Sequence, residues 1–209
     1  MKKELKVIVD LKIHERSIER KYRNYKWIMY LFIFGLSLMF FSLTLVYFLQ
    51  HISSISNQKR IIITPVFYWN TILLIMSSGI IQLAKKYYTT DNYAQYKTML
   101  ILLISSGCLF LFGQIAGWLG LYHKGYFFNQ QSASYLYVIS GLHAIHILIG
   151  LIFLFVFLSK SWKMLHNYAV SVVYFTDPVI KSQLFLFSNY WHFLTAMWVY
   201  LLFFFCVFG

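Results

Sequence analysis

Five long apolar runs, separated by short polar stretches, dominate the sequence. Each run has 20 or more residues without Asp, Glu, Lys or Arg. A helix of about 20 apolar residues crosses the hydrocarbon core of a bilayer, and its backbone groups must be hydrogen-bonded internally. A β-barrel would instead need alternating segments of about half this length. The pattern predicts an all-α integral membrane protein, a bundle of five transmembrane helices over residues 27–49, 65–84, 98–121, 135–159 and 184–208.

The stretch before the first run, residues 1–26, is polar and basic. Five of its apolar residues alternate with mostly polar ones, which is the period of a strand: Leu5, Val7, Val9, Leu11 and Ile13. We expect a disordered basic cytoplasmic tail here, with an extended segment lying on a partner subunit as the alternative. Residues 27–209 are expected to form one membrane domain. The first run is too long for a cleavable signal peptide, and no small-residue cleavage site follows it.

The basic residues are divided unevenly between the two sides of the predicted bundle. Nine of the 18 precede the first run, and fifteen in all fall on that side. The three on the other side are Lys59, Arg60 and Lys124. The positive-inside rule therefore predicts a cytoplasmic N-terminus and an external C-terminus. This placement fits anionic lipid headgroups better than nucleic acid, although the net charge is +12.

Acidic residues are absent from the apolar runs. The chain has six, all in the polar stretches, and charged residues make up only 11% of it. Proton pumps and coupled transporters usually place Asp or Glu within their spans. No nucleophile–base pair or phosphate-binding loop is visible. We therefore expect no catalytic residue, and the pattern favours a packing subunit over an independent enzyme or an ion-coupled transporter.

Three histidines lie within predicted spans: His143 and His146 in the fourth, and His192 in the fifth. Haem ligation would need histidines paired across helices at matching depth, and a metal site would need several converging ligands. Both interpretations remain open beside a structural role in hydrogen bonding between helices, which we favour. We therefore predict no cofactor or metal ligand in this chain.

Small residues recur in the second and third runs. Ser77-Ser78-Gly79 and Ser105-Ser106-Gly107 are similar, and Gly113 and Gly117 form a small-xxx-small pair. Such residues let membrane helices approach closely. Helix packing is the favoured interpretation, and a substrate path lined by these serines is the alternative. The two cysteines, Cys108 and Cys206, lie in apolar runs and are interpreted as small buried apolar residues.

Two motifs indicate a family. Gly141, His143, His146 and Gly150 resemble the GxHxxHxxxG helix of cytochrome c oxidase subunit III. The last run is similar to that family's YWHFVDxxW helix through Tyr190, Trp191, His192, Phe193 and Trp198. Weaker similarities are carried by Asn70, Thr71, Gln114, Trp118, Leu121 and Gly125. The resemblance covers residues 27–208, in order, across all five runs.

The resemblance implies a helical membrane subunit without redox centres, in the five-helix bacterial form of subunit III. Such a subunit belongs to a respiratory haem–copper oxidase in the bacterial plasma membrane and serves aerobic electron transport. It packs against subunit I, which holds the haems and copper, and is expected to contact subunit II. It is also expected to bind structural phospholipid. The glycines, aromatic residues, histidines and Gln114 of these motifs would then serve helix packing.

The chain departs from this family at three positions. Acids that the family usually carries are replaced by Leu43, Gly117 and Thr195. A proton-related role is therefore in doubt, and a divergent subunit retained for assembly and lipid binding is expected. Two alternatives remain: an accessory protein of a nitric oxide reductase, and a small membrane transporter or channel.

Overall fold

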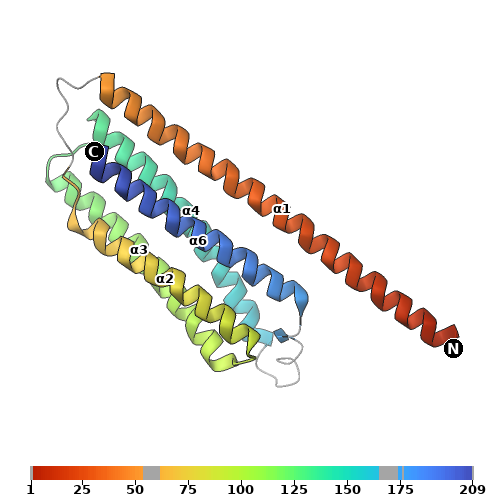
Figure 1. Cartoon of the computed structure of the whole chain (residues 1–209). Helices are drawn as coiled ribbons and strands as arrows, with labels where there is room; N and C mark the ends of the chain where they lie inside the picture. The colour runs from red at the N-terminus through yellow and green to blue at the C-terminus, as the bar shows by residue number, and fades with distance from the viewer. Residues whose placement is uncertain (1, 54–61, 165–173, 176, 209) are drawn as a thin grey trace.

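The computed structural model describes residues 2–53, 62–164, 174, 175 and 177–208, and these residues are helical with short turns and no strand. Five helices follow in order (Figure 1): α1 (Lys2–Ser53), α2 (Pro65–Thr89), α3 (Tyr93–His123), α4 (Gln131–Met164) and α6 (Pro178–Phe208). Each has a segment long and apolar enough to cross a membrane. The predicted number and approximate position of the helices are confirmed for the described part of the chain.

The first helix corrects the prediction for the N-terminal stretch. α1 runs without a break from Lys2 through residue 26 to Ser53 and is 52 residues long, so this stretch is neither disordered nor extended. Its N-terminal half extends well beyond the other helices (Figure 1). The alternation of apolar residues misled because the stretch has no Gly or Pro and is rich in Lys, Arg and Glu, which favour helix. The apolar helix that follows also supplies the nucleus from which helix propagates.

The helices form a four-membered bundle with α1 on one side. α2 and α3 are antiparallel neighbours, α3 packs on α4, and α6 closes the bundle by packing on α2 and α4. α1 packs against α6 and α4, on the side of the bundle away from α2 and α3 (Figure 1). Every helix therefore has a face that meets protein and a face left exposed. Cys108 of α3 and Cys206 of α6 lie on exposed faces, so the prediction that they are buried is wrong.

Local capping explains where several helices begin and end. Pro65 stands in the first turn of α2, where its missing N–H costs nothing. The Asn92 side chain accepts a hydrogen bond from the Gln95 amide at the start of α3, at 3.2 Å. The Asp177 carboxylate accepts one from the Val179 amide at the start of α6, at 2.8 Å. Gly125, with φ of +83°, follows the end of α3, where a left-handed residue is needed.

A glycine stripe on α3 sets its close approach to α2. A Cβ on Gly113 would collide with the Asn70 side chain, and one on Gly117 would lie 2.8 Å from Phe67 Cζ. A Cβ on Gly120 would lie 3.0 Å from Thr64 Cγ2. Gly113 and Gly117 therefore act as the predicted small-xxx-small pair, since only glycine leaves room for the α2 side chains.

Candidate functional site

Three tryptophan side chains tie neighbouring helices together. Each donates its indole N–H to a hydroxyl oxygen of another helix: Trp118 to Ser140 at 3.0 Å, Trp191 to Ser77 at 2.9 Å, and Trp198 to Thr71 at 3.0 Å. The first pair joins α3 to α4, and the other two join α6 to α2. Large aromatic bodies thus fill the core while their only polar atom is satisfied.

His143 lies at the centre of the bundle, in an aromatic cage. Its side chain is fully buried. Its ring centroid lies 6.2 Å from that of Phe40 on α1, 5.9 Å from Phe110 on α3 and 5.1 Å from Trp198 on α6. Neither ring nitrogen has a hydrogen-bond partner among the residues that the structure describes. His143 therefore packs four helices together through its ring faces and edges, rather than through its nitrogens.

Gln114 is a second buried polar side chain near this cage. It follows Phe110 by one turn of α3 and is almost completely buried, and neither of its amide atoms has a partner within the described part of the chain. Buried polar atoms without partners cost roughly 1–3 kcal/mol each, and ordered water commonly satisfies them. His143 and Gln114 together give the core of the bundle an unsatisfied polar centre.

His146 and His192 have different surroundings from His143. His146 is half-buried, and its Nδ1 lies 2.6 Å from the Leu142 carbonyl oxygen of its own helix. His192 lies on the outer side of α6, with Nδ1 2.5 Å from Ser78 Oγ and Nε2 2.6 Å from Gln82 Nε2. The three histidines do not converge. Within the described residues, no group of three or more His, Cys, Asp or Glu could hold a metal ion.

The motif residues of α4 and α6 meet along one helix interface. The Tyr190 hydroxyl donates to the His146 carbonyl oxygen at 3.0 Å. A Cβ on Gly150 would lie 3.4 Å from both Tyr190 and Trp191, so this glycine allows the aromatic rings to lie against α4. Gly141, in contrast, faces Trp118 of α3, at 3.9 Å, and lies outside this α4–α6 interface. The interface is therefore built from a small residue on α4 and aromatic residues on α6.

Gly117, Thr195 and Leu43 occupy the three positions where the family resemblance led us to expect an acidic residue. All three have ordinary packing roles. Gly117 faces Phe67 of α2. The Thr195 hydroxyl donates to the Trp191 carbonyl oxygen of its own helix at 3.0 Å, and Leu43 packs at the edge of the core. Each position is thus occupied by a residue that needs no charged partner.

A wide groove separates α1 from α4 and α6 and was not anticipated from the sequence. Its volume is about 550 Å³. Aromatic and aliphatic side chains dominate its lining, and Ser182 and Gln183 are polar exceptions. Its α1 wall is formed by Tyr25, Ile28, Met29 and Phe32, and its other walls include Ile149, Gly150, Phe153, Phe187 and Tyr190. The i, i+4, i+7 spacing of Tyr25, Met29 and Phe32 places these side chains on one face of a helix, and this spacing was the sequence signal for the α1 wall of the groove.

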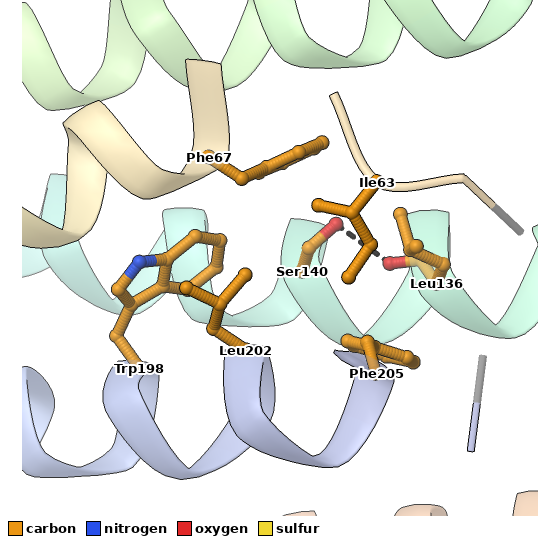
Figure 2. A pocket seen from close by; sticks show the side chains of 7 residues that line it. All are labelled: Ile63, Phe67, Leu136, Ser140, Trp198, Leu202 and Phe205. Atoms are coloured by element: carbon orange, nitrogen blue, oxygen red, sulfur yellow. Dashed lines mark hydrogen bonds between the residues drawn. The ribbon is translucent and has the colours of Figure 1, made fainter. Parts of the chain in front are cut away.

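The serines of the second and third runs do not line this groove. Ser77 and Ser106 donate to carbonyl oxygens of their own helices, those of Leu74 and Leu103. A smaller cavity of about 10 Å³ lies between α2, α4 and α6 and is lined by Ile63, Phe67, Leu136, Ser140, Trp198, Leu202 and Phe205 (Figure 2). Its one polar side chain, Ser140, donates to the Leu136 carbonyl oxygen, so the cavity offers little to a polar ligand.

A tyrosine cluster joins the ends of α2, α3 and α4 to the segment before α6, and it too was missed. The Tyr88 hydroxyl donates to the Tyr174 carbonyl oxygen at 2.8 Å, and the Tyr174 hydroxyl is hydrogen-bonded to Ser161 and, at 3.4 Å, to Tyr96. Burial raises the pKa of Tyr174, because a phenolate would be poorly solvated there. The cluster therefore keeps neutral hydroxyls and fastens this end of the bundle.

Comparison with known proteins adds no further assignment. No protein-family model and no curated protein matches the sequence. The function of the chain is therefore inferred from the motif residues and their geometry.

Proposed function

We propose that this chain is a non-catalytic subunit III of a bacterial respiratory haem–copper terminal oxidase of the cytochrome c oxidase type. It supports assembly, lipid binding and stability of the catalytic subunit during aerobic electron transport. The observation that carries the proposal is the meeting of the two motif segments, in which Tyr190 donates to the His146 carbonyl oxygen and Gly150 receives the Tyr190 and Trp191 rings.

In this proposal the five helices cross the bacterial plasma membrane, with the N-terminus in the cytoplasm and the C-terminus outside. The apolar length of the helices and the fifteen basic residues on one side support this arrangement. Subunit I, with its haems and copper, is the main partner, and subunit II is a further one. No redox group is assigned to this chain.

Structural phospholipid is proposed to occupy the groove between α1, α4 and α6. The groove volume of about 550 Å³ and its largely apolar lining suit acyl chains. Ser182 and Gln183, near the start of α6, offer hydrogen bonds to a headgroup. Tyr25 of α1 also lines the groove, and an aromatic ring with a hydroxyl suits the level of headgroups.

Purification of the tagged chain from native membranes in mild detergent tests the proposal. A haem–copper subunit should co-purify, with a haem absorption spectrum in the same fraction. Gly150→Leu should reduce this recovery at least fivefold by forcing α4 away from the rings of α6. Gly35→Leu is the matched control, because nothing lies within 4 Å of a Cβ at Gly35.

The possible outcomes separate the candidate functions. Recovery of a nitric oxide reductase subunit would show that the chain belongs to that complex and not to an oxidase. Recovery of the chain alone, with no haem protein from any preparation, would contradict both.

A further inference from the structure

A polar strip runs along the outer face shared by α2 and α6. It consists of Ser78, Gln82 and Lys85 on α2 and of Asn189 and His192 on α6, and we call it the α2/α6 polar strip. His192 joins the two helices through its contacts with Ser78 and Gln82, at 2.5 and 2.6 Å. Lys85 Nζ lies 4.4 Å from the centroid of the Phe185 ring, one turn of α6 before Asn189.

The strip has unused hydrogen-bonding capacity. Gln82 and Asn189 are exposed. Asn189 makes no side-chain hydrogen bond to any described residue, and Lys85 has no ion pair with one. The amide group of Asn189 and the ammonium group of Lys85 are therefore available to something outside the chain.

The amide groups of the strip lie within the apolar length of their helices. Asn189 is eleven residues after Pro178, or roughly 16 Å along α6 at about 1.5 Å per residue. Gln82 is seven residues before Thr89, or roughly 10 Å from the end of α2. In the membrane arrangement proposed above, the Asn189 amide lies inside the hydrocarbon core, where lipid tails cannot hydrogen-bond to it. The Gln82 amide lies close to the cytoplasmic edge of the core, two residues before the end of the apolar run 65–84.

Two other exposed polar side chains of the membrane spans have hydrogen-bond partners within their own helix. The Ser42 hydroxyl donates to the Met39 carbonyl oxygen at 2.8 Å, and the Thr98 hydroxyl donates to the Ala94 carbonyl oxygen at 2.9 Å. Each hydroxyl is satisfied by its own helix. The outward-facing amide of Asn189 has no hydrogen-bond partner among the described residues, so the strip stands out as a surface that needs a covering.

The charge of the strip indicates what covers it. The strip contributes one ammonium group, two amide groups and one imidazole group, and the apolar runs of this chain contain no carboxylate. Polar groups at membrane depth usually pair with one another across helices. A carboxylate would complement Lys85 and accept hydrogen bonds from the amides.

We propose that the α2/α6 polar strip docks a transmembrane helix of a partner polypeptide that carries an Asp or Glu side chain. This inference rests on the proposed function and refines it, because it names the face through which the chain joins its complex. The partner's carboxylate lies near Lys85, and its helix covers Gln82, Asn189 and His192.

Photo-crosslinking in native membranes tests the site. A photo-reactive amino acid is placed at Asn189, where no internal hydrogen bond is lost, and at Phe112 on α3 as a control on another exposed face. Asn189 should give a crosslinked partner polypeptide at least tenfold more often than Phe112. Crosslinks from Asn189 to lipid alone would overturn the inference, as would a partner captured mainly from Phe112.

Charge variants test the chemistry. Lys85→Glu should lower the recovery of the partner at least tenfold, whereas Lys86→Glu, at the exposed neighbouring residue, should lower it less than twofold. The thermal unfolding midpoint of each purified variant shows that the chain itself is folded. Equal recovery with both variants would overturn the carboxylate assignment.

The two proposals fail differently in these experiments. If a haem–copper subunit co-purifies but does not crosslink from Asn189, the docking site is wrong and the proposed function stands. If Asn189 crosslinks to a membrane protein unrelated to oxidases, the docking site stands and the proposed function is wrong.

Discussion

Individual polar side chains in this bundle serve two different purposes. The indole N–H of Trp191 reaches Ser77 across a helix interface, so its hydrogen bond joins α6 to α2. His143 is equally buried but leaves both nitrogens unpaired. Its stabilising contribution must come from ring packing. These two residues can be distinguished by substitutions that keep shape and remove polarity.

Trp191→Phe is expected to destabilise the bundle because it removes the N–H donor while keeping most of the aromatic body. Interhelical hydrogen bonds of this kind contribute about 0.5–1.5 kcal/mol. A double-mutant cycle with Ser77→Ala, followed by the thermal unfolding midpoint in detergent, should give a coupling energy of that size. Trp69→Phe is the control, since the Trp69 side chain is 70% exposed. Additive effects of the two core substitutions would contradict the cross-helix bond.

His143→Leu is expected to cost less than His143→Ala. Leucine keeps most of the volume within the aromatic cage, and such swaps usually cost under about 1.5 kcal/mol. Alanine leaves a cavity between Phe40, Phe110 and Trp198, which typically costs about 2–5 kcal/mol. Thermal unfolding in detergent measures both. If leucine is as damaging as alanine, an imidazole nitrogen has a partner such as an ordered water.

At the scale of the helices, closeness of approach decides the packing. α3 meets α2 through glycines whose missing side chains accommodate Asn70 and Phe67. The Asn70 amide then donates to the Phe110 carbonyl oxygen at 3.2 Å. Small residues and a cross-helix hydrogen bond thus act together at one interface.

Gly113→Ala is expected to force α3 away from α2, because its Cβ would collide with the Asn70 side chain. Overpacking of this kind costs about 1–3 kcal/mol. Gly79→Ala is a matched control, since nothing lies within 4 Å of a Cβ at that position. It should be neutral or stabilising by up to about 1 kcal/mol. Thermal unfolding of both variants checks the contrast, and equal destabilisation would show that helix propensity, not contact, matters.

The whole molecule is defined by how α1 sits beside the other four helices. α1 contacts α4 and α6 near the C-terminal end of the chain, where Thr44 and Tyr200 hydroxyls lie 2.8 Å apart and Tyr47 donates to the Phe208 carbonyl oxygen. Farther toward the N-terminus of α1, from Phe32 to Tyr25, the groove lies between α1 and the other two helices. The groove therefore exists only because α1 lies beside α4 and α6, and all three helices form its walls.

Ile149→Trp is expected to reduce the phospholipid retained by the purified protein. Ile149 lines the groove, so a larger side chain there removes space for an acyl chain. Ile152→Trp is the control, since Ile152 is similarly exposed but is not part of the groove lining. Native mass spectrometry counts the lipids retained. The groove is not a lipid site if both variants keep the same number of lipids as the unchanged protein.

Part of this organisation follows from the sequence. The five helices were predictable because apolar length is a local property that each run carries by itself. The close-packing role of Gly113 and Gly117 followed from their spacing. The N-terminal stretch was mispredicted, since alternation over a few residues is a weak signal beside helix propensity and continuity with a long apolar helix.

Only the tertiary structure decided which polar groups are buried, exposed or paired. His143 and His146 are three residues apart, yet one lies within an aromatic cage and the other bonds its own helix. The groove beside α1 and the polar strip on α2 and α6 each need residues far apart in the chain. Such features depend on helix rotation and spacing, which arise from contacts among all five helices. The sequence alone determines the apolar helices, and their packing determines the groove beside α1 and the polar strip on α2 and α6.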